Sequence, residues 1–177
     1  MSLKSDLKKS DIVVRGEVKL TSGKTSDFYC DFKKIYDNPK LLKRVVSFLA
    51  EEIKSKQLFG VTQGLTTCVA AMGHGGIPLA TAVSLNLNLP LTLIRGEKRT
   101  HGLKKNIEGY VPSAKDCVAI IDDVCAYGTS LTKIIDALSD TKSKISGCYV
   151  VILRPEVKLP FKYPIFHLIK AEELLRK

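Results

Sequence analysis

The stretch from Cys117 to Lys133, CVAIIDDVCAYGTSLTK, decides the fold. Four apolar residues run directly into the paired acids Asp122 and Asp123, as expected of a strand that is buried on both faces and ends at a binding site. A short loop, Val124 to Gly128, comes next. Apolar residues then recur at helical spacing from Leu131 onward, so the stretch predicts a strand, a loop and a helix.

The residue types at the end of this strand suit a phosphorylated sugar. In an open α/β sheet, ligands bind beyond the carboxyl ends of the strands, where a helix N-terminus offers free N–H groups and a partial positive charge. Thr129 and Ser130 add hydroxyl donors and Gly128 lets the backbone approach closely, which suits a phosphate monoester. The two carboxylates suit ribose hydroxyls or water molecules on Mg²⁺. A ligand with phosphate, ribose and metal-bound pyrophosphate would satisfy both kinds of group.

Length and composition fit one globular α/β domain, with 177 residues, 45% hydrophobic and 7% aromatic. No apolar run approaches transmembrane length, and the N-terminus lacks the apolar core of a signal peptide, so we expect a cytoplasmic protein with no membrane partner. The net charge of +10 would suit a nucleic-acid binder. However, the basic residues are spread along the chain without an arginine-rich tract, so we expect an anionic small substrate and no nucleic-acid partner.

The five cysteines have no CxxC or His-paired spacing, which argues against a zinc site and a disulfide framework. We expect reduced, mostly buried thiols. Cys125 lies inside the predicted binding loop, where both a reactive thiol and a spectator remain open. The cysteines are Cys30, Cys68, Cys117, Cys125 and Cys148.

A second feature that suits a phosphate group is the glycine-rich loop from Gly73 to Gly76, predicted between a strand and a helix that ends near Leu87. Glycines there expose N–H groups toward an anion and allow positive φ. His74 either donates to the anion or faces water. The remaining pattern predicts helices over about residues 4–13, 39–55 and 171–176, strands over 67–72, 91–94, 145–153 and 160–168, and two extended pieces within 16–31.

Together these motifs resemble the type I phosphoribosyltransferases, and among them the orotate phosphoribosyltransferases. Val118 to Ser130 resembles the signature for 5-phosphoribosyl-1-pyrophosphate (PRPP), and GGIPLATAVSLNLNLPLTLIR, from Gly75 to Arg95, resembles the orotate enzymes. The resemblance covers about residues 16 to 156. It implies an α/β fold with a central, mostly parallel sheet flanked by helices, in a single domain with a small N-terminal hood at about 1–36 and a core at about 37–177.

The resemblance also assigns the PRPP side of the site. The segment from Gly96 to Asn106 is similar to the flexible catalytic loop that reaches into the neighbouring subunit, which implies a homodimer with shared active sites. Catalysis is expected from Lys98, Arg99, His101, Asp122 and Asp123, with Mg²⁺ bound through PRPP and water and by the two acids. The residues expected to bind PRPP are Gly73, His74, Gly75, Gly76, Arg95, Arg99, His101, Asp122, Asp123, Val124, Cys125, Ala126, Tyr127, Gly128, Thr129 and Ser130.

For the base, the Ser22-Gly23 turn and the aromatic pair after it resemble the hood of the orotate enzymes. The pair either stacks on a pyrimidine or packs the hood, and an arginine would receive the substrate's carboxylate. The residues expected to bind orotate are Lys24, Phe28, Tyr29, Ala126 and Arg154. The implied reaction is transfer of 5-phosphoribosyl from PRPP to orotate, giving orotidine 5′-monophosphate and pyrophosphate, a step of UMP biosynthesis.

Several positions depart from the family pattern. Gly96 and Arg99 stand where the loop has lysines, although Lys98 lies one position away. Ala126 replaces a threonine, and Leu153 and Pro155 replace the usual polar neighbours of Arg154. The departures near the base keep open a phosphoribosyltransferase for another nucleobase. Those in the loop keep open a PRPP-binding regulator with weak or no catalysis.

Overall fold

The central layer is a six-stranded sheet. A computed structural model describes residues 2–19, 25–62, 64–96, 106–154, 159 and 161–175. Within them the strand order is β5-β4-β3-β6-β7-β8, and every pairing is parallel except β5 with β4. The expected α/β fold with a mostly parallel sheet is confirmed. The strands are β3 (Cys68–Met72), β4 (Leu91–Ile94), β5 (Ile107–Gly109), β6 (Cys117–Cys125), β7 (Lys144–Leu153) and β8 (Ile165–Lys170).

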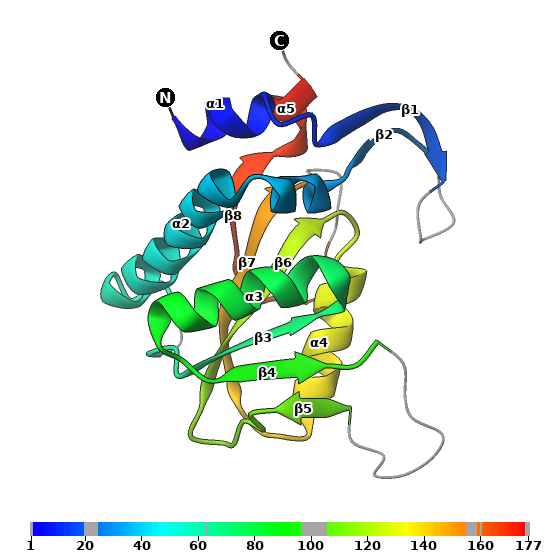
Figure 1. The fold of residues 1–177 in the computed structure, drawn as a ribbon. Coiled ribbons are helices and arrows are strands. Elements are labelled where there is room, and N and C mark those ends of the chain that lie inside the picture. The colour runs from blue at the N-terminus through cyan, green and yellow to red at the C-terminus, as the bar shows by residue number, and fades with distance from the viewer. Residues whose placement is uncertain are drawn as a thin grey trace.

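Helices cover both faces of this sheet (Figure 1). Helices α2 (Pro39–Leu58) and α3 (Gly73–Leu87) lie on one face and α4 (Thr129–Ser139) on the other. In β6, Ala119 and Ile121 join the core cluster of α2 and α3, whereas Val118 and Ile120 join that of α4. All four side chains are fully buried, so the prediction of a strand buried on both faces is confirmed.

The N-terminal hairpin lies outside the main sheet. Strands β1 (Val13–Lys19) and β2 (Thr25–Cys30) pair antiparallel, and a 3-10 helix, η1 (Phe32–Asp37), follows them. Figure 1 places them on the side of the molecule toward which β6 and β7 point. The short helices α1 (Leu3–Lys8) and α5 (Ala171–Leu175) lie side by side near the two termini.

Two boundaries near the site differ from the prediction. Strand β6 continues through Asp122 and Asp123 to Cys125, so the loop is confined to residues 126–128. Helix α3 begins at Gly73 and contains Pro78, so residues 73–76 lie at its first turn and not in a separate loop, although Gly73 has the positive φ (+73°) that was expected of this run. Glycines are poor helix formers, but contacts with the end of β6, described below, hold this turn.

The sheet edges also differ from the prediction. Strand β5 was not expected, because three residues are too few to show a pattern. The last strand is β8, which begins five residues later than the predicted start at residue 160. Its pairing with β7 from Cys148 onward sets that start, and sequence spacing does not report such a register.

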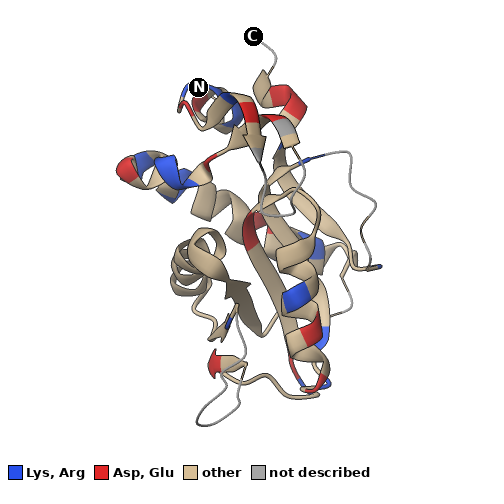
Figure 2. Cartoon of the chain, turned by 90° about the vertical axis from the view of Figure 1, so that its right-hand side faces the viewer, with Lys and Arg blue, Asp and Glu red and all other residues tan. Residues whose placement is uncertain are grey.

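The basic residues are spread over the molecule, as was expected from their spread along the sequence. Lys and Arg lie on α1, α2 and α4 and not in one patch in the view of Figure 2.

All five cysteines are buried and free, as expected. Burial raises the pKa of Cys125 to about 11, which favours the spectator role for this thiol. Among the helices of the described residues, none is long and apolar enough to cross a membrane.

Asp116, directly before β6, connects the segment after β5 to the amino end of β6 through hydrogen bonds. Its carboxylate accepts hydrogen bonds from Thr67 Oγ1 at 2.8 Å, from Tyr110 Oη at 3.0 Å, and from the backbone N and Oγ of Ser113, each at 2.8 Å. These donors, the Ser113 N–H first, lower the pKa of Asp116 from 3.8 to about 2.

Asp116→Asn is expected to lower the free energy of unfolding by about 2 kcal/mol at neutral pH. Its amide nitrogen would take the place of Oδ1 and face the Thr67 hydroxyl, and its neutral oxygen would accept from Ser113 and Tyr110 more weakly than the carboxylate does. Since the pKa of Asp116 is lower in the folded than in the unfolded chain, its ionised form stabilises fully above about pH 4 and less as the pH falls toward 2. Urea unfolding at several pH values tests this. The gap between wild type and variant should shrink below about pH 4, and a gap independent of pH would contradict the assignment.

Candidate active site

The paired acids lie at the carboxyl end of β6, in two different environments. Asp122 is buried, whereas Asp123 is half-buried. The N–H of Asp123 donates to Asp122 Oδ1 at 3.0 Å, and the N–H of Val124 donates to Asp123 Oδ1 at 2.8 Å. Burial, and then the charge of Asp123, raise the pKa of Asp122 well above its usual range. Asp123 is therefore the acid with more surface to offer a ligand.

The first turn of α3 packs directly against these acids. A Cβ atom added to Gly75 would lie 2.3 Å from Asp123 Oδ2, and one added to Gly76 would lie 3.1 Å from Asp122 Oδ1. Only glycine allows such an approach at residue 75. The first N–H groups of a helix have no partner within the helix, so the turn places anion-binding donors beside two carboxylates.

The loop after β6 forms a small pocket with the start of α4. Its volume is about 110 Å³, below the roughly 300–1,000 Å³ of pockets for whole drug-sized ligands. Gly128 has φ +71°, and a Cβ there would lie 2.6 Å from Leu159 Cδ2. The pocket thus brings together most of the predicted phosphate-binding run. Its lining residues are Asp122, Val124, Cys125, Ala126, Tyr127, Gly128, Thr129, Ser130 and Leu131.

On the hairpin side, the structure brings together two residues predicted to bind the base. The Arg154 guanidinium carbon lies 4.4 Å from the centre of the Phe28 ring, within cation–π range. Arg154 directly follows β7 and is buried, and its backbone N–H donates to the carbonyl of Cys125 at 3.0 Å. Tyr29 follows Phe28 in the sequence, and its hydroxyl accepts a hydrogen bond from Lys33 Nζ at 3.4 Å.

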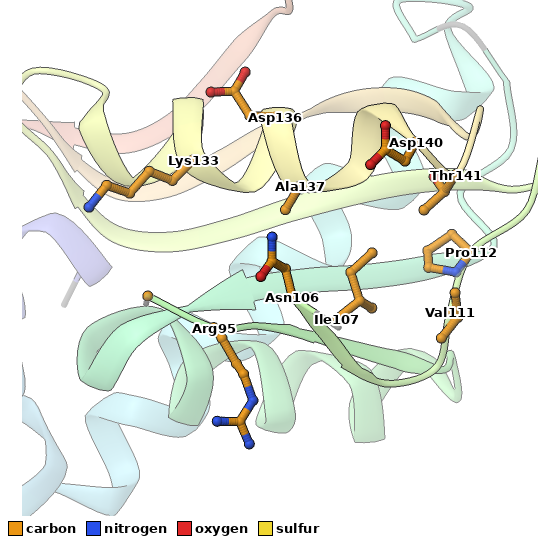
Figure 3. Close-up of a pocket in the computed structure, with 11 residues that line it drawn as sticks. Arg95, Asn106, Ile107, Val111, Pro112, Lys133, Asp136, Ala137, Asp140 and Thr141 are labelled. Carbon is orange, nitrogen blue, oxygen red and sulfur yellow. The ribbon is translucent and has the colours of Figure 1, made fainter. Parts of the chain in front are cut away.

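Arg95 lies at the end of β4 but pairs with Glu108 of β5. Its Nε donates to Glu108 Oε1 at 2.8 Å. A groove of about 700 Å³ runs between β5 and α4. Arg95 is among the residues that line it, and its side chain is directed away from α4 (Figure 3). The structure therefore does not bring the Arg95 side chain to the acid pair. His74 is exposed on the first turn of α3. Four other predicted site residues lie outside the described residues: Lys24, Lys98, Arg99 and His101.

One residue at the site was missed by the sequence reasoning. The hydroxyl of Tyr36, in η1, donates to the carbonyl of Gly75 at 2.9 Å. Burial, followed by the negative charges of Asp123 and Asp122, raises the pKa of Tyr36 to about 12. No local pattern marks this tyrosine, because its partner is 39 residues away in the sequence.

Comparison with known proteins agrees with this geometry. Residues 31–173 match the family described as "Phosphoribosyl transferase domain". A relative from Pyrococcus abyssi named "Orotate phosphoribosyltransferase" is 38% identical over 80% of this chain and 74% of its own length.

Two solved structures share the fold. The crystal structure of orotate phosphoribosyltransferase from Aeropyrum pernix superposes with a TM-score of 0.78 at 25% identity, covering 98% of this chain and 96% of that chain. Leishmania donovani UMP synthase superposes with a TM-score of 0.76 at 25% identity, and there the match covers 98% of this chain but 36% of that chain. This chain therefore belongs to the phosphoribosyl transferase family, and its relatives in that family include the orotate phosphoribosyltransferases.

Proposed function

We propose that this chain is an orotate phosphoribosyltransferase that transfers the 5-phosphoribosyl group of PRPP to orotate, giving orotidine 5′-monophosphate and pyrophosphate for UMP biosynthesis. The observation that carries the proposal is the edge of the sheet at β6. There an acid pair, a glycine-rich helix start and a phosphate-sized pocket meet in one chain of this family.

Each part of PRPP has a matching group. Residues 126–130 would bind the 5′-phosphate through N–H and hydroxyl donors, and Asp122 and Asp123 would accept from ribose hydroxyls. The first turn of α3, residues 73–76, would bind pyrophosphate. The ribose becomes cationic as pyrophosphate departs, so carboxylates near the ribose and donors near the leaving group would both stabilise the transition state.

Mg²⁺ would bind mainly through the substrate. The described residues contain no group of three or more His, Cys, Asp or Glu that could hold a metal ion by themselves. The half-buried carboxylate of Asp123, next to Asp122, suits hydrogen bonds from metal-bound water. When bound, Mg²⁺ would neutralise charge on the departing pyrophosphate.

For the base, Arg154 would receive the carboxylate of orotate, and Phe28 and Tyr29 would flank the ring, with Ala126 and Lys24 beside it. The buried guanidinium supports this proposal, because a carboxylate gains most from a donor fork that is already held in place. Lys98, Arg99 and His101 would neutralise pyrophosphate, as the resemblance of their segment to the catalytic loop implies.

We further propose a cytoplasmic homodimer whose subunits share active sites. Its support is the same resemblance of residues 96–106 to a loop that reaches the neighbouring subunit. Sedimentation velocity tests the dimer directly, and a monomer at working concentration would contradict it.

The function is tested by the PRPP-dependent loss of orotate absorbance with Mg²⁺, run beside uracil, adenine, hypoxanthine and xanthine. We expect turnover with orotate far above that with any of the other bases, its loss on addition of EDTA, and its recovery with excess Mg²⁺. Turnover mainly with another base would mean that the enzyme acts on that base and not on orotate, which the differences from the family pattern at Ala126 and Leu153 allow. PRPP binding without turnover of any base would identify a regulator.

A further inference from the structure

Tyr36 connects η1 to the first turn of α3, and its ring is held firmly. Its hydroxyl donates to the Gly75 carbonyl at 2.9 Å. The ring meets Phe32 edge to face, with centroids 6.1 Å apart and planes at 86°. Phe32 is fully buried. The hydroxyl is therefore aimed at Gly75 by a residue anchored in the core.

The turn that receives this hydrogen bond has little to hold it locally. Three of its four residues are glycines, and glycine keeps more backbone freedom than any other residue. Met72, at the N-cap, makes no side-chain capping bond. The Gly75 carbonyl and the Gly76 N–H belong to one planar peptide group. Because Met72 is the N-cap, the Gly76 N–H is the first to bond within α3, and the free N–H groups of the turn are those of residues 73–75. A hydrogen bond to the Gly75 oxygen therefore fixes the peptide group that closes the turn carrying these free donors.

The same face of η1 also reaches the predicted base side. Residues three apart in a 3-10 helix lie one above the other, so Lys33 and Tyr36 share a face. Lys33 Nζ lies 3.0 Å from Asp31 Oδ1 and 3.4 Å from the Tyr29 hydroxyl. One short helix thus contacts Tyr29 through Lys33 and Gly75 through Tyr36.

We propose that Tyr36 is a positioning residue that holds the first turn of α3 in the conformation that binds the pyrophosphate of PRPP, and so sets the affinity for PRPP. The inference deepens the proposed function and rests on it. Lys33, Asp122 and Asp123 are the charged groups that act on the hydroxyl, and burial with the two acids outweighs Lys33, which raises the pKa of Tyr36 to about 12. The hydroxyl therefore stays a donor, and its effect is independent of pH between about 6 and 10.

Tyr36→Phe tests this proposal, because it keeps the ring against Phe32 and removes only the hydroxyl. Calorimetry with PRPP and Mg²⁺ on the full chain should give roughly fivefold weaker binding, the expected effect of one neutral hydrogen bond. In steady-state assays the KM for PRPP should rise by a similar factor, while kcat at saturating PRPP changes less than about twofold.

Tyr110→Phe is the matched control. The hydroxyl of Tyr110 donates to Asp116 Oδ2 at 3.0 Å, near the amino end of the strands and away from the acid pair. Both variants are expected to unfold at a lower temperature, but only Tyr36→Phe should lose PRPP affinity. Wild-type PRPP affinity in Tyr36→Phe would overturn the inference and leave the proposed function standing. A wild-type chain that does not bind PRPP would overturn the proposed function as well.

Discussion

Gly75→Ala is expected to lower kcat/KM for PRPP by roughly a hundredfold, the factor for the loss of one or two charge-assisted hydrogen bonds at the ribose. The added Cβ would lie 2.3–2.4 Å from all three atoms of the Asp123 carboxyl group. That carboxylate is held by the Val124 N–H at 2.8 Å. The variant must therefore move either Asp123 or the first turn of α3, and each movement removes a group proposed to bind PRPP.

Steady-state kinetics with PRPP as the varied substrate measures this effect, and calorimetry separates binding from catalysis. Gly60→Ala is the control, because Gly60 has φ +64° but nothing within 4 Å of the added Cβ. It should cost some stability and leave kcat/KM unchanged.

A double variant shows whether Gly75 acts through Asp123. Gly75→Ala should cost much less in an Asp123→Ala background, because the clash is then gone. Wild-type kinetics in the single variant would contradict the packing argument. Full additivity of the two losses would show that Gly75 acts independently of Asp123.

The parts of the site that could be predicted from the sequence are those that a pattern of neighbouring residues reports. The apolar run before Asp122 and the helical spacing after Gly128 report a buried strand and a helix start directly, and both were confirmed. Residues 73–76 show the limit of such patterns. Their glycines are typical of a loop, yet they lie at the start of α3, where the close approach to Asp123 leaves no room for a side chain at residue 75.

The rest of the site depends on contacts between distant residues. Tyr36 meets Gly75 across 39 residues, and Arg95 pairs with Glu108 only because β5 adds to the sheet beside β4. Neither pairing has a signal in the local sequence. The roles given to Lys98, Arg99 and His101 stay predictions, because these residues lie outside the described part of the chain.

Arg154→Lys is expected to raise the KM for orotate by roughly a hundredfold while the KM for PRPP changes little. Lysine keeps the positive charge but lacks the planar fork that pairs with a carboxylate through two hydrogen bonds. It also loses the guanidinium carbon that lies 4.4 Å from the centre of the Phe28 ring. Steady-state kinetics with orotate varied at saturating PRPP measures the change, and PRPP calorimetry shows whether the buried substitution has left the fold intact.

Uracil separates a charge effect from a packing effect at Arg154. Uracil is orotate without the carboxylate, so Arg154 should discriminate between the two bases through that group alone. If so, Arg154→Lys lowers kcat/KM for orotate but leaves the residual rate with uracil nearly unchanged, and the preference for orotate falls by the same factor as kcat/KM. An equal loss with both bases would mean that Arg154 acts by supporting Phe28 beneath the ring. An unchanged KM for orotate would mean that another residue recognises the carboxylate.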